Sequence, residues 1–578
     1  MTAQERYQAW LDNPYFSSSV REELLAIADN QAEIEDRFYQ DLKFGTAGLR
    51  GILGAGTNRM NFYTVARAAE GYARALVKTE ANAKAEGIGI SYDSRHFSAE
   101  FAELTARIFL KHGYKVYLSD ELRPVPLISF AIRSRGCAGG VMVTASHNPK
   151  AYNGFKVYSR DGSQLDPEAA DLVAREMDQL KDLPALLRDL PELDSAGDNL
   201  VYLSRDLDQE YREYLLGLAI NHAAIERQKD MKIVYSPLHG TGYKPVTEAL
   251  AALGFEAVHV VPEQALPDGD FPTAPYPNPE AREALELGIQ LAEKEQADLL
   301  IATDPDADRL GVAVRTNEGE FKILSGNEIG ILLMDYILSA KAKLNADDKQ
   351  HFCVCSVVSS RLPRLICQDY GVKLYECLTG FKFIAEKMRE GLAKGEVFDF
   401  AFEESFGYLI GDRVRDKDAV VAAAMVCEMA AAARDEGMSL YERCNELFKR
   451  YRYAAEKTVA FTREGKEGLA SIANAMKEVR ANRAELFNAL EPVKLDDFAV
   501  PEEYSFASKS SSALDVNPSN LLIYSLNDLD WFATRPSGTE PKLKVYMGAY
   551  RKDQKEAQAA LERIEAEVVD VIEKLLDA

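Results

Sequence analysis

The apolar positions of the chain recur in three copies of one pattern, and each copy predicts a strand, a helix and a second strand. In the first copy, apolar runs at residues 89–93 and 115–118 flank a helical segment at 98–111, for which Ser98 is the expected N-cap. The same order recurs in two later segments, 232–261 and 352–375. Because strand–helix–strand units build parallel sheets, the sequence predicts an α/β fold with three homologous βαβ-type domains that contain mixed sheets.

Both ends of the chain depart from this pattern. Residues 1 to about 40 have helical spacing, and the run 22–36 contains no Pro or Gly, which predicts a helical N-terminal arm. Near the other end, a helical segment, two short strands and a long amphipathic helix at 552–575 surround a more irregular stretch that includes residues 508–512. We therefore expect a separate α+β domain at the C-terminus.

Each repeated unit is followed by a further apolar strand that ends in a polar loop. The three loops are Thr144-Ala-Ser-His-Asn148, Thr303-Asp-Pro-Asp-Ala-Asp-Arg309 and Glu403-Glu-Ser-Phe-Gly407. In α/β sheets, chemistry is found on loops just past the carboxyl ends of strands. Equivalent loops from three homologous units are therefore expected to meet at one cleft.

Ser146 is the candidate nucleophile of the first loop. A buried strand ends at Thr144, and Pro149 prevents regular structure from continuing. The flanking residues do not form the Gly-x-Ser-x-Gly elbow of acyl hydrolases. Taken alone, the loop is equally well explained as a turn in which Ser and Asn cap backbone groups.

Three alternating carboxylates in the second loop, Asp304, Asp306 and Asp308, predict a metal site. Oxygen ligands on a short loop suit Mg²⁺. A calcium-binding EF-hand also begins with alternating aspartates, but it needs Gly at its sixth position and Glu at its twelfth. Arg309 and Arg315 occupy those positions, so the calcium loop is excluded.

A fourth polar loop near the C-terminus has the composition of an anion site. It offers a guanidinium, two hydroxyls and backbone N–H groups from four residues, Arg535, Ser537, Gly538 and Thr539.

In the third loop, Glu403 and Ser405 suit sugar hydroxyls, although a buried salt-bridge cluster explains them equally well. Arg50 ends a glycine-spaced loop that would suit a phosphate, although an ordinary glycine turn is the simpler interpretation.

Composition narrows the class of protein and of partner. Of 578 residues, 47% are hydrophobic and 28% charged, as in a globular protein with several cores. The formal net charge of −24 argues against nucleic acid or a membrane as a partner and leaves a small anionic substrate possible. No apolar signal or membrane-spanning run is seen, and the seven cysteines suit buried thiols in a reducing compartment, so we expect a cytoplasmic protein.

A serine nucleophile, a Mg²⁺ loop, a polyol-binding loop and a phosphate cradle together describe phosphoryl transfer on a sugar phosphate. On these motifs, in this order, the chain resembles the α-D-phosphohexomutases, the phosphoglucomutase/phosphomannomutase family, from about Phe44 to its C-terminus. The N-terminal arm and the sequence around Glu403 are more similar to the branch of phosphoglucomutases and phosphopentomutases. The resemblance implies four domains around a central cleft, here expected at residues 44–205, 206–325, 326–450 and 451–578, after an arm at 1–43.

The resemblance also implies roles for individual residues. Ser146 would carry a phosphoryl group, and Mg²⁺ would be bound by the three aspartates and a phosphoserine oxygen. Lys156 matches a lysine proposed as general base. The remaining implied residues are His147 and Arg50 for catalysis; Arg309, Thr379, Gly380, Glu403, Ser405 and Lys417 for the sugar phosphate; and Arg535, Ser537, Gly538 and Thr539 for its non-reacting phosphate.

The implied reaction interconverts glucose 1-phosphate and glucose 6-phosphate through glucose 1,6-bisphosphate, which also acts as activator. Phe406 and Gly407 follow Ser405, and Phe381 stands where some members have histidine, so mannose phosphates are disfavoured. A phosphopentomutase, a phosphomannomutase, a sugar bisphosphate synthase and a non-catalytic sensor remain alternatives. The expected assembly is a monomer or a homodimer.

Overall fold

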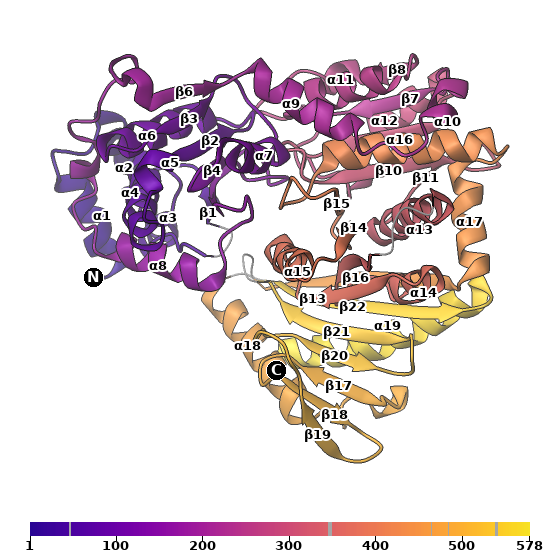
Figure 1. The fold of residues 1–578 in the computed structure, drawn as a ribbon. Coiled ribbons are helices and arrows are strands. Elements are labelled where there is room, and N and C mark those ends of the chain that lie inside the picture. Colours follow the sequence, from indigo (N-terminus) through magenta and orange to yellow (C-terminus); the bar gives the residue numbers. More distant parts are fainter. Residues whose placement is uncertain (46–47, 345–348, 464, 484, 538–541) are drawn as a thin grey trace. The chain divides into compact units, whose positions relative to one another are not determined.

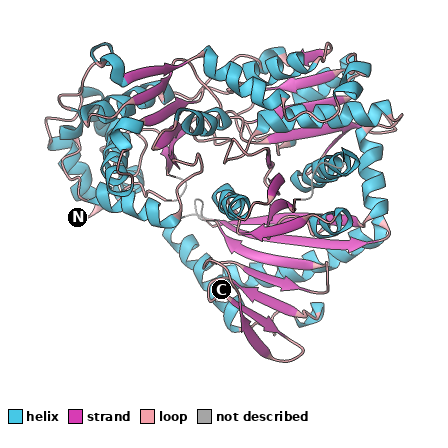
Figure 2. Ribbon diagram, viewed as in Figure 1, coloured by secondary structure: helices cyan, strands magenta, loops and turns pink. Residues whose placement is uncertain are grey.

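The computed structural model describes residues 1–578 apart from 46–47, 345–348, 464, 484 and 538–541. The chain forms two compact units, one of residues 1–354 with 380–441 and one of residues 355–379 with 442–578. Figure 1 labels their elements, and Figure 2 separates helices from strands. Within the described residues, no helix is long and apolar enough to cross a bilayer.

The first sheet of the first unit is mixed and has the strand order β1-β5-β4-β2-β3-β6. Its strands are β1 (Leu49–Ile52), β2 (Ile88–Tyr92), β3 (Val116–Ser119), β4 (Gly139–Val143), β5 (Tyr152–Ser159) and β6 (Leu200–Leu203). β2 is parallel to β3 and β4, whereas β5 is antiparallel to β4 and β1. Its helices are α4 (Phe62–Thr79), α5 (Ala83–Glu86), α6 (Ser98–Lys111), α7 (Val125–Arg135) and α8 (Pro167–Asp178). β4 is fully buried, and the loop that contains Ser146 begins where this strand ends.

The start of α6 differs from the prediction that Ser98 caps it. The N-cap is Phe97, whose backbone is left-handed with φ 64°, and Ser98 is the first helical residue. The Ser98 hydroxyl instead donates to Oδ1 of Asp93 at 2.7 Å. The serine is therefore used to hold the loop that follows β2.

The N-terminal arm is helical, as predicted, but it is divided into α1 (Ala3–Asp12), α2 (Ser18–Ala26) and α3 (Gln31–Phe38). The run 22–36 is not one helix, because the Asn30 side chain accepts from the N–H of Glu33 at 3.1 Å and caps a new helix. Trp10 and Phe16 of the arm pack against Tyr63 of α4. The arm is thus anchored by aromatic contacts to the first sheet's layer.

The second sheet has the order β11-β10-β9-β7-β8. Its strands are β7 (Ile233–Ser236), β8 (Val258–Val260), β9 (Leu299–Thr303), β10 (Leu310–Arg315) and β11 (Phe321–Ile323). Its helices are α9 (Arg205–Leu216), α10 (His222–Arg227), α11 (Tyr243–Leu253) and α12 (Arg282–Glu295). β9 and β10 are an antiparallel pair, and the turn between them carries the three aspartates.

The rest of the first unit contains a further pair of antiparallel strands and several helices. The antiparallel strands β14 (Val397–Glu403) and β15 (Gly407–Ile410) carry the third polar loop between them. Helices α13 (Gly326–Leu344), α15 (Phe381–Ala393) and α16 (Ala419–Asp435) also belong to this unit, whereas β12 (His351–Ser356) and α17 (Leu440–Arg450) contain its boundaries with the second unit. Short 3₁₀ turns occur at Pro184–Leu187, Leu193–Ser195, Gly197–Asn199, Pro262–Gln264 and Asn488–Leu490.

The second unit contains α14 (Leu362–Tyr370), β13 (Lys373–Cys377) and an antiparallel seven-stranded sheet of order β16-β22-β21-β20-β17-β18-β19. Its strands are β16 (Tyr453–Thr462), β17 (Lys494–Asp497), β18 (Glu502–Ser505), β19 (Ser510–Ala513), β20 (Leu522–Ser525), β21 (Trp531–Pro536) and β22 (Lys542–Arg551), and its helices are α18 (Gly465–Ala481) and α19 (Gln554–Asp577).

This α+β arrangement and the α/β class of the first unit are confirmed. The stretch 508–512 is more regular than predicted, since β19 pairs with β18. All of β19 is exposed, so no alternation of apolar residues marks it in the sequence.

Candidate active site

Ser146 lies directly beyond the carboxyl end of β4 and is 3% exposed. Its backbone is left-handed, with φ 53°, a conformation that non-glycine residues adopt rarely and mostly at functional sites. Its N–H donates to Oγ1 of Thr144 at 2.8 Å. The loop therefore holds this serine in one defined orientation.

Arg95 fixes the same loop from behind and was not identified from the sequence. Its buried guanidinium donates to four carbonyl oxygens of the loop and its continuation, those of Ser146, Asn148, Pro149 and Tyr152. Oδ2 of Asp93 lies 3.3 Å from Nε of Arg95. The signal was available, because Asp93 and Arg95 follow β2, the parallel neighbour of β4, at the same edge of the sheet.

The three aspartates, called the acidic triad below, converge in the turn from β9 to β10. One potential ligand atom from each lies within 4.8 Å of the other two. The N–H groups of Asp308 and Arg309 donate to Oδ1 of Asp304 at 3.0 and 2.9 Å, which folds the turn around that carboxylate. Among the described atoms, Oδ1 of Asp306 and Oδ1 of Asp308 are buried without a hydrogen-bond partner.

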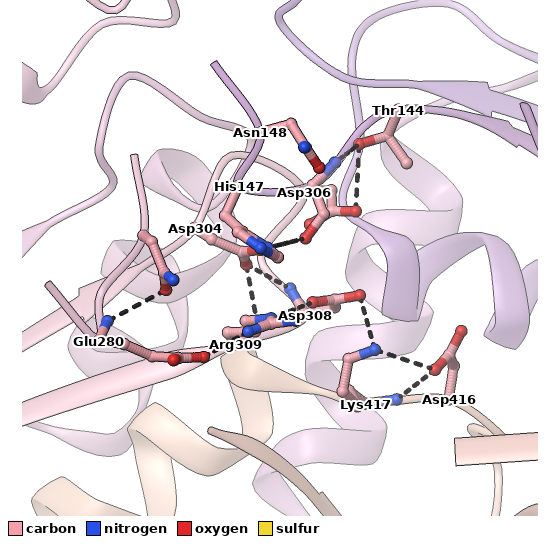
Figure 3. A network of polar contacts seen from close by, with 12 residues as sticks. Thr144, His147, Asn148, Glu280, Asp304, Asp306, Asp308, Arg309, Asp416 and Lys417 are labelled. Atoms are coloured by element: carbon pink, nitrogen blue, oxygen red, sulfur yellow. Dashed lines mark hydrogen bonds and ion pairs between the residues drawn. The ribbon is translucent and has the colours of Figure 1, made fainter. Parts of the chain in front are cut away.

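The Ser146 loop and the acidic triad are in direct contact (Figure 3). Oγ of Ser146 donates to Oδ2 of Asp304 at 2.6 Å, and Oγ1 of Thr144 donates to Oδ2 of Asp306 at 3.1 Å. Two loops separated by more than a hundred residues thus form one polar centre.

Two lysines neutralise part of the triad's charge. Nζ of Lys156, on β5, lies 2.8 Å from Oδ2 of Asp306 and 3.1 Å from Oδ2 of Asp308. Nζ of Lys417 lies 3.0 Å from the same oxygen of Asp308. Burial lowers the pKa of Lys156, but Asp306, Asp308 and Asp416 outweigh it, so this pKa lies above its ordinary value and the group is an ammonium.

The carboxyl groups of Asp304 and Asp308 have pKa values shifted in opposite directions. Burial, reinforced by the charges of Asp306 and Asp308, raises the pKa of Asp304 well above its usual range. Burial acts in the same sense on Asp308, but Lys156 and Lys417 outweigh it and lower its pKa. The proximity of three buried carboxylates is therefore unfavourable without further positive charge.

His147 is a neutral imidazole beside the serine. Burial, and then the charges of Arg309 and Arg50, hold the pKa of His147 well below its ordinary value. Its Nδ1 lies 3.2 Å from Oγ of Ser146, and its ring packs edge-on against Tyr276. A neutral imidazole in this position has the chemistry of a proton acceptor.

Two arginines predicted for the site also lie at the polar centre. Arg50, on β1, donates to Oδ1 of Asn148 at 3.0 Å. Arg309, at the end of the triad turn, pairs with Glu280. Figure 3 shows Arg309 beside Asp308, with Lys417 on the far side of that carboxylate.

The third polar loop approaches the triad turn through its backbone. Arg309 and Gly407 form an isolated bridge, and the N–H of Leu310 donates to the carbonyl of Phe406 at 3.0 Å. Glu403 is buried at the end of β14 and accepts from the N–H of Gly380. Ser405 follows it and is partly buried.

Asp416 is a second residue that the sequence analysis did not identify as functional. Its Oδ2 accepts from the hydroxyl of Tyr158 at 3.0 Å and from Gln164 at 2.9 Å. Its Oδ1 accepts from the backbone N–H of Lys417 at 2.9 Å. Asp416 therefore orients the segment that presents Lys417 to the triad.

The remaining predicted residues belong to the second unit. Thr379 is the last residue of the first of the two segments that form this unit, 355–379 and 442–578. Arg535 lies within β21. The N–H of Ser537 donates to the carbonyl of Lys542 at 2.8 Å. Gly538 and Thr539 lie outside the described residues.

Comparisons with known proteins match nearly the whole chain. Three segments, residues 41–183, 209–319 and 325–451, match the domains described as phosphoglucomutase/phosphomannomutase, alpha/beta/alpha domains I, II and III. The phosphoglucomutases of Staphylococcus aureus strains MRSA252 and N315 are each 36% identical over 521 residues, which cover 90% of this chain and 92% of theirs.

Solved structures share the fold. The phosphoglucomutase pp63/parafusin of Paramecium, in an open form, has a TM-score of 0.67 at 18% identity and covers 93% of this chain and 96% of its own. A phosphoglucomutase/phosphomannomutase family protein of Burkholderia thailandensis has a TM-score of 0.65 at 19% identity, over 92% and 97% of the two chains.

Proposed function

The chain belongs to the phosphoglucomutase/phosphomannomutase family of α-D-phosphohexomutases, which are isomerases, and we propose that it interconverts glucose 1-phosphate and glucose 6-phosphate. The observation that carries this proposal is the 2.6 Å contact between Ser146 and Asp304, which joins a candidate phosphoryl carrier to a candidate metal site. The names of the relatives that are 36% identical support glucose as the sugar.

The acidic triad fits a divalent cation. Two buried carboxylate oxygens have no hydrogen-bond partner among the described atoms, and the three ligand atoms lie within 4.8 Å of one another. An all-oxygen set with this charge suits Mg²⁺. We propose that Asp304, Asp306 and Asp308 hold it, with an oxygen of phosphorylated Ser146. When bound, Mg²⁺ supplies positive charge against which the charge of the moving phosphoryl group is neutralised.

In the first half of the proposed reaction, the O–P bond of phosphorylated Ser146 breaks as an O–P bond forms to the C6 hydroxyl of glucose 1-phosphate. The hydroxyl proton leaves the sugar at the same time, and the freed Oγ of Ser146 takes up one proton, so the serine ends as a hydroxyl. Lys156 is the base that the family resemblance implies, and this role stays a prediction, because the carboxylates around Lys156 raise its pKa and favour the ammonium, which donates rather than accepts. In that form, Lys156, with Lys417 and Arg50, balances negative charge near the transferred group.

The second half returns a phosphoryl group to Ser146 from the C1 position of glucose 1,6-bisphosphate. The O–P bond at C1 breaks, an O–P bond to Oγ of Ser146 forms, and glucose 6-phosphate leaves. The seryl proton has two acceptors in place, Oδ2 of Asp304 at 2.6 Å and Nδ1 of the neutral His147 at 3.2 Å. A neutral His147 is therefore proposed to take this proton, and the C1 oxygen of the departing sugar takes up one proton in its place.

The other parts of the substrate are assigned to the remaining loops. Glu403 and Ser405, with Gly380 and Thr379, are proposed to bind the sugar hydroxyls. Arg535 and Ser537, with Gly538 and Thr539, are proposed to bind whichever phosphate is not reacting. Both assignments follow the motifs, and the residues of the second group belong to the second unit.

The test is a comparison of initial rates with glucose, mannose and ribose 1-phosphates at saturating Mg²⁺ and catalytic glucose 1,6-bisphosphate. We expect glucose 1-phosphate to be used fastest, because a site that hydrogen-bonds specific hydroxyls discriminates strongly against sugars that leave its groups unpaired. Faster turnover of ribose 1-phosphate would replace the hexose assignment with a pentose one. Release of inorganic phosphate without isomerisation would refute a mutase.

A further inference from the structure

The first unit contains a cavity of about 870 Å³ that is separate from the phosphoserine site. Three segments form most of its walls, namely the loop from β3 to α7, helix α9 and the beginning of helix α11, and Tyr92, Leu266 and Pro267 complete the lining. We call it the α9/α11 cavity. Neither Ser146 nor a member of the acidic triad lines it within the described part of the chain. Its volume lies in the range of pockets that hold small molecules, roughly 300–1,000 Å³.

The wall of this cavity is hydrogen-bonded to the outer side of the triad turn. Thr241 lines the cavity, and its N–H and its Oγ1 donate to the carbonyl of Pro305 at 2.8 and 2.9 Å. Pro124 also lines it, and the next residue, Val125, donates its N–H to the carbonyl of Asp306 at 2.9 Å. Three hydrogen bonds thus connect the cavity wall to the backbone of the triad turn at Pro305 and Asp306.

The cavity wall at Gly240 is packed directly against the triad turn at Pro305. A Cβ atom at Gly240, which lines the cavity, would lie 2.4 Å from Cα of Pro305. The two preceding residues, Leu238 and His239, have φ values of 45° and 61°, a left-handed backbone that non-glycine residues adopt rarely. A displacement of this wall would therefore be transmitted to Pro305 rather than absorbed by a gap.

The charges of the cavity lining cancel. The lining includes four Arg or Lys side chains and four Asp or Glu side chains. Each pair of these three walls is joined by one ion pair. Arg123–Asp208 joins the loop to α9, Lys244–Glu121 joins α11 to the loop, and Arg212–Glu248 joins α9 to α11. Three of the four cations are thus paired with carboxylates, and Arg205 is the fourth cation. Because the lining sets four carboxylates against an anion such as a sugar phosphate, the cavity does not select for phosphate.

Apolar and aromatic side chains supply the rest of the surface. The lining includes four leucines, Leu122, Leu127, Leu215 and Leu266, and three tyrosines, Tyr92, Tyr211 and Tyr243. Such surfaces bind ring systems by burial of apolar area and by ring stacking. The ligand that matches this cavity is an uncharged molecule with a ring body.

We propose that the α9/α11 cavity binds uncharged, ring-bearing small molecules and that its occupant alters the affinity of the acidic triad for Mg²⁺. The physical link is the set of three hydrogen bonds from Thr241 and Val125 to the triad turn. The second half of this proposal rests on the proposed metal site, whereas the first half does not.

The test uses Prodan, an uncharged naphthalene dye whose emission shifts in apolar surroundings, titrated into the full-length protein in chelator. Leu266→Glu places a charge on a cavity residue that is 69% exposed, so folding should not suffer. The matched control is Leu25→Glu, which alters a 54% exposed leucine of α2 that does not line the cavity. We expect saturable one-to-one binding that is weakened at least tenfold by Leu266→Glu and unchanged by Leu25→Glu.

Coupling is then measured by calorimetric titration of Mg²⁺ with and without saturating Prodan. We expect the Mg²⁺ dissociation constant to change at least threefold, and Mg²⁺ to change the dissociation constant of Prodan by the same factor, as linkage requires. Displacement of Prodan by glucose 1-phosphate, equal binding to both variants, or an unaltered Mg²⁺ constant would each overturn the proposal. Titration of Mg²⁺ without dye tests the metal site alone, so a failure of the proposed function is recognised separately.

Discussion

Oγ of Ser146 and Oδ2 of Asp304 lie 2.6 Å apart, with the serine donating. Phosphorylation would remove this donor and place about 1.5 to 2 negative charges beside three buried carboxylates. Lys156 and Lys417 compensate only part of that charge, since both contact Asp308. A phosphorylated Ser146 is therefore expected to depend on a bound cation, whereas an unmodified one is not.

The first prediction is that the purified protein carries one phosphoryl group on the peptide containing Ser146. Chelation of divalent cations should lower the thermal midpoint of this form by several degrees more than that of Ser146→Ala, because only the phosphorylated form adds charge next to the triad. Intact and peptide mass spectrometry, with thermal scans in Mg²⁺ and in chelator, provide the measurement.

Ser146→Ala should also abolish mutase turnover while Mg²⁺ still binds. The control is Ser134→Ala, which alters an exposed serine on α7 and should behave as the parent. Catalytic glucose 1,6-bisphosphate should reactivate the dephosphorylated parent after a lag. Interconversion by Ser146→Ala at the parent rate would exclude the phosphoserine mechanism.

The second prediction concerns Asp306. Asp306→Asn removes one anionic ligand and should lower the rate by roughly a hundredfold or more, by analogy with the loss of one preorganised transition-state contact. Calorimetry should show weaker Mg²⁺ binding in this variant, with Asp29→Asn, an exposed change in the arm, as the control. Full activity in excess chelator would contradict the metal assignment.

Much of the fold could be predicted because many of its strands are apolar runs and some of its helices end at glycines. Gly371, for example, ends α14 in a left-handed conformation, as a glycine stop should. The missed features lack such signals. Phe97 is a poor N-cap by residue type, and the exposed serines of β19 show no alternation, so pairing with β18 could not be foreseen.

The polar centre could be predicted only in part for a similar reason. Ser146 and the acidic triad follow buried strands directly, and the rule about carboxyl ends finds them. Arg95 satisfies the same rule, but its role depends on carbonyl groups of a loop about fifty residues later, which no side-chain pattern reveals. Asp416 acts through Tyr158, more than two hundred residues earlier, and such a contact has no local signature.

The third prediction tests the Arg95 contact to the Ser146 loop. Arg95→Lys keeps the charge, but an ammonium cannot reach four carbonyl groups with the geometry of a planar guanidinium. We expect amide hydrogen exchange across residues 146–152 to accelerate and the turnover number to fall about ten- to a hundredfold. Arg107→Lys is the matched control, because Arg107 also donates to backbone carbonyls but at residues 190 and 191. Unaltered exchange in Arg95→Lys would contradict the positioning role.

The fourth prediction concerns the phosphate loop. Arg535→Lys retains the charge and loses the planar fork, so the KM for glucose 1-phosphate should rise about tenfold, the cost of one hydrogen bond to a charged group. Arg483→Lys, in the same unit but paired with Glu502, should leave the KM unchanged. An unaltered KM in Arg535→Lys would count against this assignment.

The fifth prediction concerns Asp418, which caps α16. Its carboxylate is fully buried and accepts from the hydroxyl of Tyr211 at 2.7 Å and from the N–H groups of Val420 and Val421 at 3.1 and 3.0 Å. Burial nevertheless raises the pKa of Asp418 to about 6, because these donors do not replace the lost hydration. The unfolded chain should titrate this group near its ordinary pKa of about 4.

Between those two values, the folded state holds a proton on Asp418 that the unfolded state has released. Stability therefore falls as the pH rises through this window, and the folded protein loses up to about 3 kcal/mol from this group. Asp418→Asn keeps a good N-cap and removes the titration. In urea denaturation from pH 4 to 7, the variant should lack this share of the decline, whereas Asp166→Asn, at the exposed N-cap of α8, should follow the parent. Parallel pH profiles for Asp418→Asn and the parent would show that Asp418 ionises normally and that the hydroxyl and two N–H groups fully offset its burial.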